Sequence, residues 1–155
     1  MSEAQRRARH EQQVAELCAA TVRAFSGETD LHFRGQRLHR GREPLPWFAP
    51  HLHPSPETDD FTSFRGAADG LALRLTASDT ALHLSLRPQE QVEGMVFELL
   101  EQFRVEALAP ETMPGMLRNL RHRHEQWSLA FHHSGLTERA QGILLYTVEI
   151  GRAHV

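Results

Sequence analysis

Lysine is missing from this 155-residue chain, so all 17 of its basic residues are arginines. A phosphate-binding loop that ends in Gly-Lys-Ser/Thr needs its lysine to reach the phosphates of a nucleotide. The sequence therefore excludes ATP hydrolysis by a loop of this kind.

Cysteine is scarce as well, because Cys18 stands alone and a single cysteine cannot form an internal disulfide. The N-terminus lacks an apolar signal core, and no apolar run approaches the length of a membrane span. We therefore expect a reduced, cytoplasmic setting and no membrane partner. Net charge is −3, and the arginines are not interleaved with aromatic residues, which argues against binding of nucleic acid.

Apolar residues make up 40% of the chain, enough for one domain, which we expect to span residues 1–148. In four segments these residues recur at steps of three and four. That spacing predicts amphipathic helices over about 4–25, 89–108, 114–133 and 136–148.

Strand-like alternation of apolar and polar residues marks two other places. Leu71, Leu73 and Leu75 are followed, after a short polar link, by a second alternating run, Leu82, Leu84 and Leu86. This pattern predicts a β-hairpin over about 71–86, with residues 31–34 as a candidate third strand. The predicted fold is α+β, a small antiparallel sheet packed by the helices.

Residues 35–64 contain five prolines and follow no periodic pattern, so we expect a long loop. Loops of this length inside a domain are usually functional or disordered. The neighbouring aromatic residues Trp47 and Phe48 indicate that at least the middle of the loop packs against the body.

Two features of the helices over 89–108 and 114–133 each leave two interpretations open. Glu101 and Arg104 are spaced to pair across one helical turn, either as an exposed pair or as a partly buried one that fixes how two helices meet. The first helix is acidic and the second is basic, with Arg118, Arg121 and Arg123. The two helices either complement each other or offer a docking surface.

Three segments, at 19–27, 65–75 and 101–120, occur in an order and spacing that resemble a known family. They begin Ala19-Ala20-Thr21, Arg65-Gly66-Ala67-Ala68-Asp69 and Glu101-Gln102-Phe103-Arg104-Val105-Glu106, and the last continues to Met113-Pro114-Gly115-Met116 and Asn119-Leu120. Together they resemble the T subunit (CobT) of the aerobic, ATP-dependent cobaltochelatase. The family tends to place a glycine where this chain has Ala109-Pro110.

By this resemblance, the chain is a non-catalytic, chaperone-like assembly domain of a complex that inserts cobalt into the corrin ring in cobalamin biosynthesis. The implied partners are an AAA+ ATPase subunit and a large metal-inserting subunit. The implied cofactors of the complex are ATP, magnesium and cobalt. The resemblance implies no cofactor for this domain itself. The residues carried over from the family motif are Arg65, Gly66, Asp69, Glu101, Arg104, Glu106, Met113, Gly115 and Asn119.

The end of the chain, residues 149–155, reads like the translation of a sequencing-adapter oligonucleotide. We therefore expect a non-native tail on a protein truncated before a von Willebrand A-like domain, with a natural tail as the alternative.

Eleven histidines suggest a second function, a small metal-binding protein. His51 and His53 lie two apart in the proline-rich loop near Asp59 and Asp60, and could bind a zinc or cobalt ion. The other interpretation is a solvated loop with incidental histidines. A stand-alone enzyme is a third hypothesis, for which no nucleophile–base pair or carboxylate pair is apparent.

Overall fold

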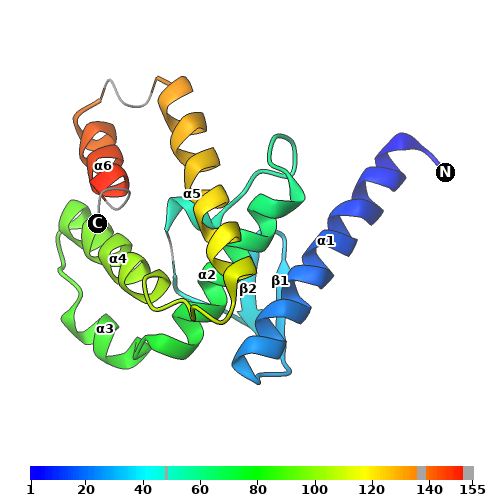
Figure 1. Cartoon of the computed structure of the whole chain (residues 1–155), viewed down its shortest axis with the longest axis horizontal. Helices are drawn as coiled ribbons and strands as arrows, with labels where there is room; N and C mark the ends of the chain where they lie inside the picture. Colours follow the sequence, from blue (N-terminus) through cyan, green and yellow to red (C-terminus); the bar gives the residue numbers. More distant parts are fainter. Residues whose placement is uncertain (48, 136–138, 152–155) are drawn as a thin grey trace.

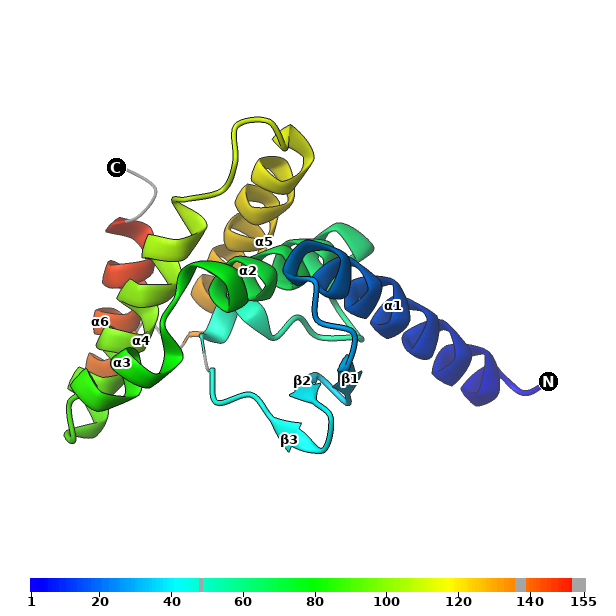
Figure 2. The same cartoon turned by 90° about the horizontal axis from the view of Figure 1, so that it is seen from below.

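The computed structural model of the chain describes residues 1–47, 49–135 and 139–151. Its architecture is built around one helix, α2, which contacts three others (Figures 1 and 2). These helices are α2 (Phe61–Ala77), α1 (Glu3–Ser26), α4 (Gln91–Glu106) and α5 (Pro114–His133). The short α3 (Thr80–Leu86) joins α2 to α4, and α6 (Ala140–Gly151) packs against α4 and α5.

The sheet is a small antiparallel meander beside α1, formed by β1 (Leu31–Arg34), β2 (Arg37–Arg40) and β3 (Glu43–Pro44). Gly35 opens the two-residue turn between β1 and β2 with a φ of +60°, a conformation that glycine adopts without steric cost. Leu31 and Leu38 bury their side chains in the core. The predicted strand over 31–34 and the α+β class are therefore confirmed.

The predicted hairpin over 71–86 is wrong, because these residues belong to α2 and α3. Alternation of Leu71, Leu73 and Leu75 indicated a strand with one apolar face, but α2 is buried from Gly66 through Arg74 on every side. A helix that is buried all round does not need an amphipathic pattern. The polar link after Ala77 is no hairpin turn, since Asp79 caps α3 by accepting a hydrogen bond from the backbone N–H of Leu82.

The segment 35–64 is more ordered than the long loop that we predicted. It contains β2, β3, the 3-10 helix η1 (Pro50–Leu52) and the first residues of α2. Leu45, Trp47 and Leu52 lie in the core, as the aromatic residues of this segment indicated. Phe48 lies outside the described residues.

Helix boundaries agree closely with the periodicity for α1 and α5. α4 begins later than expected, at Gln91, because the side chain of Glu90 caps it by accepting from the backbone N–H of Glu93.

The predicted start of the last helix, at 136–138, lies outside the described residues. α6 continues to Gly151, into the segment 149–155, and 152–155 are again outside the described part. In the described ranges no helix is long and apolar enough to cross a membrane.

Candidate functional site

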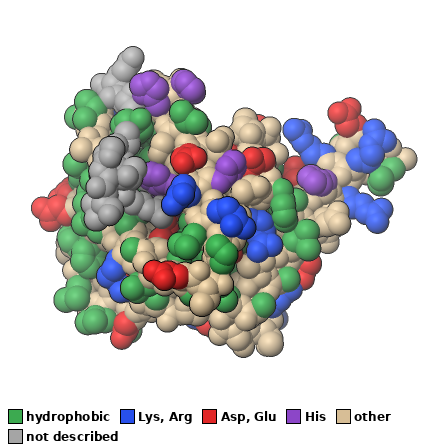
Figure 3. Space-filling model, in the orientation of Figure 1, with side chains coloured by type: hydrophobic (Ala, Val, Ile, Leu, Met, Phe, Trp, Pro, Cys, Tyr) green, Lys and Arg blue, Asp and Glu red, His purple; other side chains and the backbone are tan. Residues whose placement is uncertain are grey.

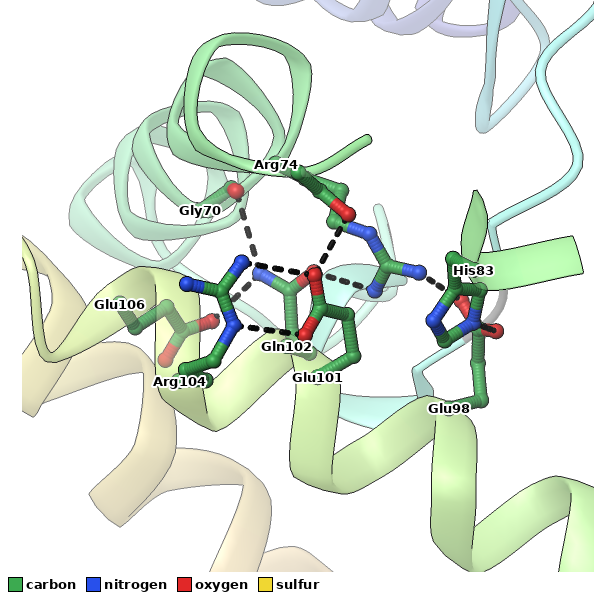
Figure 4. A network of polar contacts seen from close by, with 9 residues as sticks. Gly70, Arg74, His83, Glu98, Glu101, Gln102, Arg104 and Glu106 are labelled. Carbon is green, nitrogen blue, oxygen red and sulfur yellow. Dashed lines mark hydrogen bonds and ion pairs between the residues drawn. The ribbon is translucent and has the colours of Figure 1, made fainter. Parts of the chain in front are cut away.

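The polar face of α4 is turned inward, toward α2. Glu98, Gln102 and Glu106 follow one another at steps of four, so they lie on one side of the helix, and all three side chains are buried. Their partners come from α2, α3 and η1, and Figure 4 shows the part of this network around Arg74. We call these contacts the buried polar network.

Arg74 of α2 is the cation of this network and is only 1% exposed. Its Nη2 donates to Oε1 of Glu98 over 2.8 Å, and its Nη1 lies 3.5 Å from Oε1 of Gln102. Its guanidinium also lies over the ring of Trp47, 5.9 Å from the centroid. Burial lowers the pKa of Arg74, and the nearby charge of Glu98 acts in the opposite direction. Removal of either charge would take away the main charged partner of the other buried group.

The second oxygen of Glu98 holds α3 in place. Oε2 lies 2.7 Å from Nε2 of His83, the buried residue of α3. The His83 ring also stacks on Phe97 of α4, with centroids 4.7 Å apart. A helix of seven residues is too short to be stable alone, so these contacts fix its position.

Glu106 carries the network to η1. Its Oε1 lies 2.8 Å from Nε2 of His51 and accepts a hydrogen bond of the same length from Nε2 of Gln102, which also donates to the Gly70 carbonyl. Arg123 of α5 closes this end by donating to the His51 carbonyl over 2.6 Å.

The buried Arg123 also pairs with Asp59, 2.9 Å away. Arg123, one of the three arginines that make α5 basic, therefore binds residues of the segment 51–59.

His51, the first predicted metal ligand, thus packs at a helix junction with 2% of its surface exposed. His53 is partly buried, and burial lowers its pKa, which disfavours its charged form. Within the described ranges, no three or more His, Cys, Asp or Glu side chains are grouped so that they could hold a metal ion.

The predicted pair of Glu101 and Arg104 forms, with N–O distances of 2.7 and 2.8 Å. Arg104 also donates to the carbonyl of Ala77, the last residue of α2, and the hydroxyl of Ser78 donates to Glu101. The pair therefore caps the end of α2 and fixes it against α4 (Figure 4). Glu101 is mostly buried, whereas the Arg104 side chain is 51% exposed. The hydrogen bond from Arg104 lowers the pKa of Glu101 from its usual 4.5 to about 2.

The motif residues of α2 lie against α5. A Cβ atom on Gly66 would come within 2.3 Å of the Asn119 carbonyl oxygen, so only glycine permits this helix crossing. The Asn119 side chain donates to Asp69 over 2.9 Å. Burial raises the pKa of Asp69, while Asn119 and the charge of Arg65 oppose that effect.

The two remaining motif residues mark the start of α5. Met113 is its N-cap residue, directly before Pro114, and is 44% exposed. Gly115 has open space beside it, because a Cβ atom added there would lie 3.9 Å from its nearest neighbour, the side chain of Arg118.

Sequence reasoning missed Arg74, His83, Glu98 and Gln102, the centre of the network. The four-residue steps from Glu98 to Glu106 were visible, but they are typical of a solvated helical face, and the partners lay in a segment predicted as a hairpin. The network joins five elements, α2, α3, α4, α5 and η1, and its side chains bind mainly to one another. Its chemistry is that of a scaffold, in which the family-motif residues set how α2, α4 and α5 cross.

The comparisons agree with the distribution of these residues. A sequence model of the family described as cobalamin biosynthesis protein CobT matches residues 9–144, which include all three motif segments and the whole network. No solved structure matches the chain. The match spans most of the sequence, and the chain belongs to the CobT family of cobalamin biosynthesis proteins.

Proposed function

We propose that this chain is a non-catalytic assembly domain, with a chaperone-like role, in an ATP-dependent cobaltochelatase that acts in the cytoplasm. Its partners are an AAA+ ATPase subunit and a large metal-inserting subunit. ATP and magnesium serve the ATPase subunit, and cobalt is the substrate that the complex inserts into the corrin ring.

The observation that carries this proposal is the surface of α3. Leu82, Leu84 and Leu86 are 56%, 50% and 62% exposed, on a helix anchored by the buried His83. Leu100 of α4 is 53% exposed. Figure 3 shows apolar side chains at the lower left, over α3 and α4. Covering such side chains releases free energy in proportion to the apolar area removed from water.

The buried polar network supports the same role, because it holds this apolar surface in a fixed place. Arg74 orients Glu98, and Glu98 in turn holds His83. The motif residue Glu101 secures the end of α2 just before α3 begins. These residues thus act by presenting a surface for a partner rather than by contacting a substrate.

Co-purification with the ATPase subunit and with the large subunit tests this role. The double variant Leu82→Ser/Leu86→Ser removes apolar surface that the fold does not bury, so we expect an unchanged circular dichroism spectrum and loss of binding to one subunit. Leu129→Ser is the matched control, since Leu129 of α5 is 53% exposed. Equal binding by the double variant, the control and the original chain to both subunits would refute the proposal.

Assays of ATP turnover and cobalt insertion test the absence of catalysis. We expect neither activity from the chain alone, and cobalt insertion only when all the subunits, with a complete T subunit, are combined. Turnover or insertion by the isolated chain would overturn the assembly role.

A further inference from the structure

The apolar surface of α3 continues onto one side of α4. Glu93, Phe97, Leu100 and Arg104 follow one another at steps of four, three and four, so they lie along one side of that helix. Phe97 stacks on the ring of His83, which places this side of α4 next to α3. The exposed Leu100 therefore lies beside the leucines of α3. We call the four exposed side chains Leu82, Leu84, Leu86 and Leu100 the leucine surface.

Acidic residues lie at both ends of the leucine surface. At one end, the exposed Glu90 caps α4 and the exposed Glu93 follows in the first turn. At the other end, the exposed Asp79 caps α3 directly after Ser78, whose hydroxyl donates to Glu101. Glu93 and Glu101 are eight residues apart on α4, so the two ends are about 12 Å apart. Figure 3 shows acidic side chains at the left edge and at the bottom of this area. We call Asp79, Glu90 and Glu93 the acidic rim.

The charges of the acidic rim are not neutralised within the chain. Among the residues that the structure describes, none of the three carboxylates forms an ion pair. Two arginines lie nearby. Arg104 already pairs with Glu101, and Arg87 packs on α4, where its guanidinium nitrogens are 3.4 Å from a Cβ atom added to Gly94. One arginine thus opposes three unpaired carboxylates, and the surroundings of the leucine surface carry a net negative charge.

This charge decides between the occupants that an exposed apolar surface can have, which are another protein, a second copy of the chain and a membrane. A two-fold dimer through the leucine surface would bring two acidic rims together, and like charges across an interface repel. An anionic phospholipid surface would be repelled for the same reason. A protein segment that carries Lys or Arg is attracted, so it is the occupant that the charge favours.

The leucine surface consists of side chains from two helices and offers no strand edge with which an extended segment could pair. A helix is recognised by such a surface through an apolar stripe at steps of three and four residues. We propose that the partner subunit binds the leucine surface with an amphipathic helix whose apolar stripe has a basic residue at each end, about eight residues apart. This inference rests on the proposed function, because it takes the leucine surface as the partner site of the assembly.

Two synthetic helical peptides of about 18 residues test the charge. Both have the same stripe of leucines and glutamine at most polar positions. The two ends of the stripe carry lysine in one peptide and glutamate in the other. Fluorescence anisotropy measures the binding of each labelled peptide to the whole chain. We expect the lysine peptide to bind roughly tenfold more tightly than the glutamate peptide, with an affinity that falls as the salt concentration rises.

A variant of the acidic rim tests where the lysine peptide binds. Glu90→Gln/Glu93→Gln removes two rim charges, while glutamine keeps an oxygen that can cap α4. We expect this variant to bind the lysine peptide roughly fivefold more weakly, with an unchanged thermal melt. Glu57→Gln/Glu125→Gln is the matched control, because it makes the same charge change at exposed positions before α2 and on α5. The control should bind the lysine peptide as the original chain does.

Equal binding of the two peptides, or equal binding by the rim variant and its control, would overturn the inference. So would binding of the lysine peptide that survives Leu82→Ser/Leu86→Ser. A dimer of the chain that this leucine variant dissociates would identify a second copy as the occupant. Leucine-dependent binding to vesicles of phosphatidylglycerol would identify a membrane, and either result would refute the basic helix.

Co-purification of the same variants with the two subunits separates this inference from the proposed function. If a subunit binds through the leucines, and binds the rim variant as tightly as the control, the assembly role stands and the basic helix is refuted. If the lysine peptide binds as expected but neither subunit does, the leucine surface takes a basic helix and the assembly role is refuted.

Discussion

Arg74 offers the sharpest test of the buried polar network, because it is buried and its main charged partner is known. Arg74→Met keeps most of the side-chain volume and removes only the guanidinium group. Glu98, 6% exposed, then loses the charge 2.8 Å from its Oε1 and retains His83 as its partner. Breaking a buried pair in this way costs about 3–5 kcal/mol. A domain of this size typically has a free energy of unfolding of about 5–15 kcal/mol, so the variant should be strongly destabilised.

Urea unfolding at neutral pH, followed by circular dichroism, measures this free energy. The double variant Arg74→Met/Glu98→Gln removes both charges, and its glutamine can still accept a hydrogen bond from His83. We therefore expect the double variant to be more stable than Arg74→Met by more than about 1 kcal/mol. Arg104→Ala is the control, because the Arg104 side chain is half exposed and water screens its pair with Glu101, which should contribute only about 1 kcal/mol. If Arg74→Met costs less than about 1 kcal/mol, or if neutralising Glu98 brings no recovery, the network is not what holds α2 to α4.

Three further predictions concern other parts of the structure. Glu101→Gln should lower the free energy of unfolding at pH 7. The shift of the Glu101 pKa from 4.5 to about 2 corresponds to at most about 3 kcal/mol, and because Arg104 is exposed to solvent we expect a loss of about 1 kcal/mol. Because the pKa of Glu101 is depressed in the folded state, this stabilisation is present above the usual pKa and is lost as the pH falls from about 4.5 toward 2. The free energies of unfolding of the two proteins should therefore converge in acid. A difference that stays constant with pH would contradict the assignment. Gly66→Ala should cost about 2 kcal/mol or more, since the added Cβ meets backbone at 2.3 Å, whereas Gly115→Ala, in open space, should be neutral or stabilising in thermal melts. Limited proteolysis should cut near the exposed residues 56–58 well before it cuts within α2, and early cleavage between Leu71 and Ala77 would contradict the fold.

The sequence predicted those elements whose amphipathic pattern survives in the structure. α1 and α5 each have one solvated face, so apolar residues at three- and four-residue steps marked their extents. The alternating residues at 31–34 marked the first strand of the sheet, whereas its partner strands lay in the segment that we predicted as a loop. The pairing of Glu101 with Arg104 was predictable because its two members lie one turn apart on one helix.

The central helix could not be found in this way, because α2 has no solvated face from Gly66 to Arg74. Its leucines, Leu71, Leu73 and Leu75, alternate with the two-residue period of a strand by chance. The polar partners of α4 were hidden for the same reason, since Arg74 and His83 fell in the predicted hairpin. Gly66 and Gly70, four residues apart, were the signal that could have revealed the helix, because such spacing permits close approach on one side.

The buried polar network connects the proposed partner surface on α3 to η1 and α5, and it behaves as a rigid support. Contacts run from His83 through Glu98, Arg74, Gln102 and Glu106 to His51, and Arg123 continues them to Asp59, just before α2. A signal along this path would require an element with two arrangements of similar free energy. Here each rearrangement would expose a buried carboxylate or guanidinium group to an apolar surrounding without its partner, which is costly. The network therefore keeps α3 at a fixed position relative to η1 and α5, so that a partner bound to the leucines of α3 would be held in a constant orientation relative to the rest of the domain.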